Sequence, residues 1–130
     1  MDDSPSDRVI EQRLRNRAIE ALEVLAQGDD GVRAVGNSDY INYFFDTIDD
    51  DVLPGWRDSS ALTPDEVLEL DRVQRVLLDA CSATPQVEPD DDFIASGWPE
   101  RIKPIATDAL AVMLQRGRFR EDREEDAPSG

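Results

Sequence analysis

The stretch TPDEVLELDRVQRVLLDACSA, residues 63–83, decides the fold class of this chain. Thr63 is a favoured N-cap residue, Pro64 suits the first helical position, and Glu66 can return a hydrogen bond to the cap, which together make a capping box. Apolar residues then recur at steps of three and four, as on one face of an α-helix. We predict a helix over 64–83 that stops before Pro85. The side chains expected in its buried stripe are Val67, Leu70, Val73, Leu77, Ala80 and Cys81.

The same spacing predicts two more long helices, over 7–27 and 99–116. Ser6 is a suitable N-cap for the first, and Gly28 a suitable stop. Trp98-Pro99 opens the last helix, and Gly117 ends it. Side chains of the last helix expected to face inward are Ile102, Ile105, Ala106, Ala109, Leu110, Met113 and Leu114.

The segments between the long helices predict loops and short helices. GDDGVRAVGN, residues 28–37, contains three glycines and indicates a loop. YINYFFDTI, residues 40–48, indicates a short helix, although its aromatic and β-branched residues also suit a strand. Phe93 to Ser96 indicates a helical turn capped by an aspartate. In the helix over 40–48, the residues expected to be buried are Ile41, Phe44, Phe45 and Ile48, with Tyr40 and Tyr43 near the rim.

Length and composition suit one domain with a modest core, because the chain has 130 residues and 39% hydrophobic content. We therefore predict an all-α fold: a small single-domain helical bundle of three long helices plus one or two short ones. Residues 1–6 are expected to be a flexible N-terminus, 7–119 the helical domain, and 120–130 a disordered acidic tail.

Charge narrows the classes of partner. The chain has 30 acidic and 14 basic residues and no histidine, for a formal net charge of -16. Such a surface repels phosphate backbones and anionic lipids and attracts basic proteins, so we expect no binding to nucleic acid or membranes. Most of the excess lies between Asp29 and Asp92, with 17 acids and four bases. A host-wide acidic adaptation would spread the charge more evenly.

No pattern for catalysis or metal binding is present. Without histidine, neither a Ser-His-Asp nor a Cys-His arrangement can form, and the lone Cys81 cannot make an intramolecular disulfide or a cysteine-based zinc site. The aspartate runs do not match a calcium loop, and no glycine-rich phosphate loop is found. We predict no enzyme activity, no cofactor and no metal. The N-terminal MDDSPSDR lacks the features of a secretory signal, which favours a cytoplasmic protein.

Two segments, DDDVLPGW (49–56) and DDDFIASGW (90–98), each lead from three aspartates to a tryptophan. Tryptophan is a common interface anchor, and acidic groups beside it orient a basic partner. Core packing remains the alternative for both Trp56 and Trp98. The predicted partner-binding residues are Asp49, Asp50, Asp51, Trp56, Asp58, Asp90, Asp91 and Asp92, with Tyr40 and Tyr43 beside them.

The resulting prediction is a non-enzymatic acidic protein that docks on a basic protein partner. An immunity protein or antitoxin that neutralises a cationic toxin is one class that fits. Two alternatives remain open. One is a housekeeping or regulatory helical domain whose acidity reflects its host proteome. The other is a carboxylate-based hydrolase that uses a divalent metal. The sequence leaves the oligomeric state open.

Overall fold

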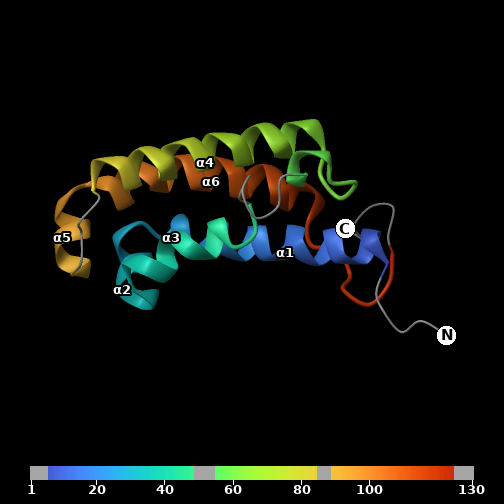
Figure 1. The fold of residues 1–130 in the computed structure, drawn as a ribbon, viewed down its shortest axis with the longest axis horizontal. Helices are drawn as coiled ribbons and strands as arrows, with labels where there is room; N and C mark the ends of the chain where they lie inside the picture. Colours follow the sequence, from blue (N-terminus) through green and yellow to red (C-terminus); the bar gives the residue numbers. More distant parts are fainter. Residues whose placement is uncertain (1–5, 49–54, 85–88, 125–130) are drawn as a thin grey trace.

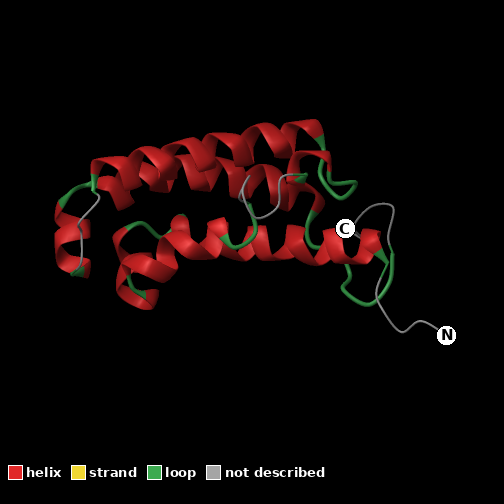
Figure 2. Ribbon diagram, viewed as in Figure 1, coloured by secondary structure: helices red, strands yellow, loops and turns green. Residues whose placement is uncertain are grey.

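The computed structural model describes residues 6–48, 55–84 and 89–124 of the chain. Within these ranges the regular structure is helical, with six α-helices, one short 3-10 helix and no strand (Figure 2). The predicted all-α fold class is therefore confirmed.

Three long helices form the body of the bundle: α1 (Asp7–Leu25), α4 (Pro64–Ala83) and α6 (Trp98–Arg116). Helices α4 and α6 lie side by side and run in opposite directions, and α1 packs along α6 (Figure 1). Helix α3 (Asn37–Phe45) packs against α1. Two short helices, α2 (Asp29–Val35) and α5 (Asp90–Ala95), close one end of the bundle, whereas the 3-10 helix η1 (Trp56–Asp58) lies toward the other (Figure 1).

The capping box that begins α4 is formed as predicted. The Thr63 hydroxyl accepts a hydrogen bond from the Glu66 amide at 3.2 Å, and the Glu66 carboxylate accepts one from the Thr63 amide at 2.9 Å. Pro64 occupies the first turn, and α4 ends at Ala83 as expected. Local residue chemistry thus sets both the start and the length of this helix.

Helix α1 begins and α6 ends where the sequence predicts, and α6 begins one residue earlier, at Trp98. The Ser6 hydroxyl caps α1 by accepting from the Val9 amide at 3.3 Å, and Gly117 ends α6 with a φ of 80°. Helix α1 is shorter than predicted, because it ends at Leu25. Gly28 does not close α1 but serves as the N-cap of α2.

The prediction of a loop over residues 28–37 is wrong, since most of this stretch forms α2. Two of its glycines flank the helix instead of interrupting it. The third, Gly31, allows close packing, because a Cβ there would lie 2.3 Å from the Val24 carbonyl oxygen of α1. Asp29 and Asp30 in the first turn and Arg33 in the last complement the helix dipole.

The two remaining short helices were predicted with different accuracy. Helix α3 confirms the helical interpretation of the aromatic segment. Helix α5 starts at Asp90, before the predicted turn, and its N-cap is Pro89 without a side-chain hydrogen bond. The aspartates do not cap it. They occupy its first turn, where the helix dipole favours negative charge.

The core combines apolar side chains from all three long helices with aromatic rings from α3 and α5. Fully buried members include Ile19, Leu22, Leu25, Tyr40, Phe44, Leu70, Leu77, Phe93, Ile102 and Met113.

Three expectations about burial are wrong. Tyr40 is fully buried, whereas Cys81 is exposed and Leu114 is 51% exposed. Tyr40 faces α5, where its ring meets Phe93 edge-on at 5.9 Å. Cys81 and Leu114 each follow a buried residue by one position, and a rotation of about 100° per residue turns them away from the packed face.

Residues Phe119–Arg123 return along the first half of α1. The Asn16 side chain donates to the Phe119 carbonyl at 2.7 Å and accepts from the Phe119 amide at 3.0 Å. The Gln12 amide group donates to the carbonyls of Arg120 and Arg123, each at 2.9 Å. Of the predicted acidic tail, 120–124 are among the described residues, and 125–130 lie outside them.

None of the described helices is both long enough and apolar enough to cross a lipid bilayer.

Candidate functional site

The predicted partner-binding residues do not form one surface. Asp49, Asp50 and Asp51 lie outside the described residues. Trp56 and Asp58 belong to η1, whereas Asp90–Asp92 belong to α5 at the opposite end of the bundle (Figure 1). The two similar sequence segments therefore do not combine into a single acidic and aromatic patch.

Trp56 is 6% exposed and packs in the core. The guanidinium of Arg57 lies 4.4 Å from the centre of a Trp56 ring and also pairs with Asp71 at 2.6 Å. Trp98 is half-buried, with the guanidinium of Arg101 4.1 Å from its ring centre. Core packing, the alternative considered for both tryptophans, agrees with these positions.

The two tyrosines differ in position. Tyr40 is buried, and its hydroxyl forms no hydrogen bond with the described residues. Burial, together with the negative charges of Asp29 and Glu100, raises the pKa of Tyr40. Tyr43 is 41% exposed and lines a groove between α1 and α3. Only Tyr43 presents an accessible ring.

The three aspartates of α5 also differ. Asp90 is half-buried, and its carboxylate accepts a hydrogen bond at 2.9 Å from the backbone amide of Asn37, the first residue of α3. It therefore joins α5 to α3. Asp91 and Asp92 are exposed and form no ion pair with the described residues. These two carboxylates are free to meet a partner.

Exposed carboxylates are carried by α2, α5 and the first turns of α3 and α6, which meet at one end of the bundle. We call this surface the acidic end. It consists of Asp30, Asp39, Asp91, Asp92 and Glu100.

Eight of the 14 basic residues lie elsewhere. Residues 8–17 of α1 and the segment from the end of α6 onward supply Arg8, Arg13, Arg15, Arg17, Arg116, Arg118, Arg120 and Arg123. Three cations also belong to this end: Arg33, which pairs with Asp30 at 3.3 Å, and Arg101 and Lys103 in the first turns of α6. Asp39, Asp91 and Asp92 form no ion pair with the described residues. The charge is thus unevenly distributed along the long axis of the described bundle.

A pocket of about 270 Å³ lies beside the acidic end, between α3, the end of α4 and α5. We call it the polar pocket, because amide and hydroxyl groups alternate with apolar side chains around it. Its lining residues are Asn37, Ser38, Ile41, Asn42, Cys81, Thr84 and Phe93.

Cys81 is the thiol of this pocket. It was expected in the core but is exposed, and partial burial of its sulfur raises the pKa of the thiol. A raised pKa lowers the thiolate fraction at neutral pH, and this does not favour a nucleophilic role for Cys81.

A second pocket, of about 260 Å³, lies between α1, the end of α3 and η1. Most of its lining is apolar, from Leu14, Ala18, Ile48, Trp56 and Leu62, and Arg15 and Glu11 border it. The Glu11 carboxylate is engaged by the backbone amide of Ser60 at 2.7 Å.

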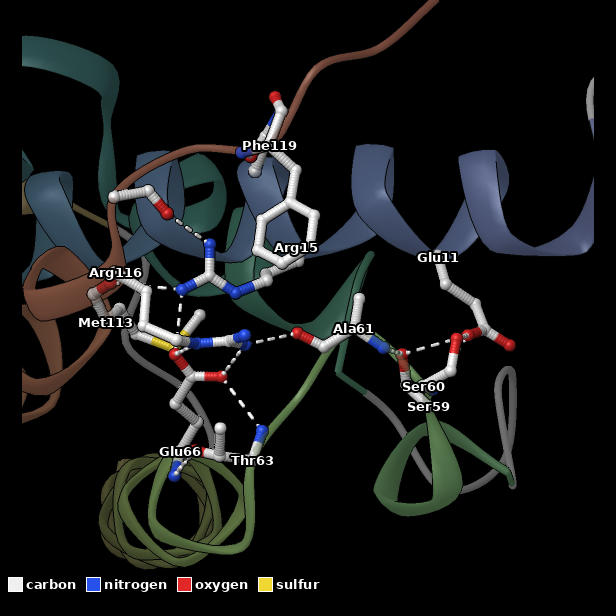
Figure 3. Close-up of polar contacts among 12 residues, drawn as sticks. Glu11, Arg15, Ser59, Ser60, Ala61, Thr63, Glu66, Met113, Arg116 and Phe119 are labelled. Carbon is white, nitrogen blue, oxygen red and sulfur yellow. Dashed lines mark hydrogen bonds and ion pairs between the residues drawn. The ribbon is translucent and has the colours of Figure 1, made fainter. Parts of the chain in front are cut away.

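A buried ionic cluster lies next to this apolar pocket (Figure 3). Glu66 accepts from Arg15 at 2.7 Å and from Arg116 at 2.6 Å. Arg15 also donates hydrogen bonds to the carbonyls of Met113, at 3.0 Å, and Gly117. It thereby provides partners for backbone carbonyls at the C-terminal end of α6, which have none within the helix. The Phe119 ring covers the cluster, with the Arg15 guanidinium 4.9 Å from its centre.

This cluster has a structural role. Burial on its own would raise the pKa of Glu66, but hydrogen bonds from Arg116, Arg15 and the Thr63 backbone outweigh that effect and hold the pKa below 4.5. The carboxylate is therefore ionised at neutral pH, and its oxygens are occupied. It is not available as a general acid or base.

Among the described residues, no group of three or more His, Cys, Asp or Glu side chains is arranged to hold a metal ion. The metal-dependent hydrolase considered from the sequence thus gains no support from this part of the chain.

The residues of the polar pocket were not identified from the sequence. Asn37, Ser38 and Asn42 are common surface residues of α3, and they line a pocket because the end of α4 and Phe93 of α5 lie beside them. Ile41 was predicted only as a buried residue of the aromatic segment, and Phe93 only as the start of a helical turn. Comparison with protein-family models, with curated proteins and with solved structures finds no match to this chain.

Proposed function

We propose that this chain is a non-enzymatic binding protein that docks on a basic protein through its acidic end. The observation that carries the proposal is the set of exposed carboxylates at Asp39, Asp91 and Asp92, which have no cationic partner among the described residues. A negative field concentrated at one end accelerates encounter with a positive surface and orients it.

The class of partner follows from the sign and placement of this charge. A cationic protein whose working surface must be covered, such as a nucleic-acid-cleaving toxin, would meet the acidic end as it meets a phosphate backbone. An immunity protein or antitoxin is accordingly the specific role that we propose within this broader function.

Charge-neutralised variants used as bait test the proposal. In the first variant Asp39, Asp91 and Asp92, all in first helical turns, are changed to Asn. In pull-downs from host lysate at low salt, we expect a basic protein that wild type retains and this variant loses. Binding of the isolated partner should be about tenfold weaker, since exposed charge pairs contribute up to about 1 kcal/mol each.

The matched control changes Asp7, Asp58 and Asp65 to Asn. These residues also occupy first helical turns, and the change alters net charge equally, but they lie in α1, η1 and α4. We expect the control to bind the partner as wild type does. Equal losses in both variants would show that only total charge matters and would contradict docking through the acidic end.

A further inference from the structure

We propose that the polar pocket receives an arginine side chain of the basic partner. This inference rests on the proposed function and identifies the contact at its centre. It goes beyond the acidic end itself, because it assigns one side chain of the partner to one cavity of this chain.

The shape of the pocket suits a long side chain with a polar tip. Ile41 and Phe93 provide apolar contacts for a methylene stem, and the pocket volume of about 270 Å³ leaves room for the whole side chain. The amide residues Asn37 and Asn42 and the hydroxyl residue Thr84 line the same space. An amide oxygen or a hydroxyl can accept from a guanidinium.

The charge around the pocket favours a cation. The carboxylate of Asp90 accepts a hydrogen bond from the backbone amide of the pocket residue Asn37, and Asp92 directly precedes the pocket residue Phe93. Asp39 follows Ser38 in the first turn of α3 and lies one turn before Asn42. The seven lining residues are uncharged, so the carboxylates of Asp39, Asp90 and Asp92 beside them give the pocket a negative surrounding.

Arginine fits this setting better than lysine. Its guanidinium is more weakly hydrated than an ammonium, so it loses less on entering a partly enclosed cavity. Its five N–H donors fan out in a plane, which suits polar groups on more than one element. Helix α3 contributes Asn37, Ser38 and Asn42 to the lining, and the end of α4 contributes Thr84.

Cys81 reports on occupancy of the pocket. It is the only cysteine of the chain, it is exposed, and it lines this cavity. A side chain seated in the pocket blocks access of an alkylating reagent to the thiol. The experiment therefore measures the rate at which iodoacetamide modifies Cys81, with and without hexa-arginine amide at low salt.

We expect hexa-arginine, at about ten times its dissociation constant, to slow modification of Cys81 about tenfold. Hexa-lysine at equal occupancy should slow it much less. Asn42→Trp, at an exposed lining position, should fill the cavity and abolish the effect of hexa-arginine, whereas Asn42→Ala should retain most of it. Equal protection by hexa-lysine would overturn the assignment of arginine.

The matched control carries Ala111→Cys in a Cys81→Ser background, because Ala111 is exposed on α6 away from the pocket. Hexa-arginine should leave the modification rate of the control unchanged. Equal slowing there would mean that the peptide coats the whole protein surface, and it would contradict binding in the polar pocket.

Fluorescence anisotropy of labelled hexa-arginine separates the failure of this proposal from the failure of the proposed function. If peptide binding requires Asp39, Asp91 and Asp92 but does not protect Cys81, the proposal of an arginine pocket is contradicted and docking through the acidic end is retained. If changing those aspartates does not weaken peptide binding, docking through the acidic end is contradicted as well.

Discussion

At the scale of single residues, Glu66 shows how one carboxylate serves two purposes. It completes the capping box of α4 and neutralises two arginines, one of which has a fully buried side chain. Removing its charge leaves buried positive charge without a partner. We therefore expect Glu66→Gln to lower the free energy of unfolding at pH 7 by about 3 kcal/mol, measured by urea denaturation.

The pH dependence of this loss has a defined sign. Because the pKa of Glu66 is lower in the folded state than its ordinary 4.5, its contribution is complete above that pH and is lost as the pH falls below it. The stability difference between wild type and Glu66→Gln should therefore shrink on acidification. Asp65→Asn, exposed in the same helical turn, is the control and should cost less than about 1 kcal/mol. A difference that stays constant with pH would contradict the ionised buried state.

Tyr40 offers the opposite case, a buried polar atom that contributes little. Its hydroxyl forms no hydrogen bond with the described residues, although its ring packs against Phe93. We expect Tyr40→Phe to change thermal stability by less than about 1 kcal/mol, or to increase it, because no hydrogen bond is lost. A clear loss of stability would mean that the hydroxyl has a partner.

Residue-scale burial was the least predictable property from sequence. The periodicity of α4 and α6 located the buried faces, but a one-residue error in the edge of a face moves a side chain from inside to outside. Cys81 and Leu114 were misplaced for that reason. Tyr40 was misplaced because its burial depends on α5, which joins α3 from far along the chain.

At the scale of elements, local signals were sufficient wherever a cap or a periodic stripe was present. Helices α1, α4 and α6 were predicted because Ser6, Thr63 and Gly117 mark their ends and their apolar residues repeat. Helix α2 was missed because its glycines resemble a loop in sequence. Their purpose is tertiary, since Gly31 lets α2 approach the end of α1.

The turn between α1 and α2 depends on Gly28, which has a φ of 60°. A Cβ at this position would lie 2.1 Å from Glu100 Oε2, which accepts a hydrogen bond from the Asp29 amide at 3.0 Å. Gly28→Ala combines backbone strain with displacement of this carboxylate. We expect it to lower the free energy of unfolding by about 2–3 kcal/mol.

Gly97→Ala is the comparison, because Gly97 also has a positive φ, 85°, but nothing lies within 4 Å of an added Cβ. This variant meets backbone strain alone and should lose only about 1 kcal/mol. Chemical denaturation of the two variants and of wild type would measure both losses in the free energy of unfolding. Equal losses would show that the carboxylate of Glu100 moves aside without consequence.

At the scale of the whole molecule, the charge is uneven along the bundle. The sequence shows that acidic residues are concentrated between Asp29 and Asp92, but it does not show where they lie in space. The two similar segments, 49–56 and 90–98, contribute to separate elements, η1 and α5. No local pattern encodes which ends of helices meet. The proposed site therefore had to be defined from the arrangement of α2, α3, α5 and α6.

Mutual repulsion among these charges should appear as a salt effect on stability. The formal net charge is -16, so raising sodium chloride from about 0.05 M to about 0.5 M at pH 7 should increase the melting temperature, because screening weakens self-repulsion. Near the isoelectric point of about 4.1, the same addition should have little effect. Thermal unfolding followed by circular dichroism provides both measurements. A fall in melting temperature at pH 7 would mean that favourable ion pairs dominate.

The return of residues 119–123 along the first half of α1 has a practical consequence. The Gln12 side chain donates a hydrogen bond to the Arg123 carbonyl at 2.9 Å, so the last described residues lie beside the first half of α1. A fused domain or a surface tether joined at that pole would leave α5 pointing outward. A tether placed there would therefore leave the acidic end accessible to the partner that we propose.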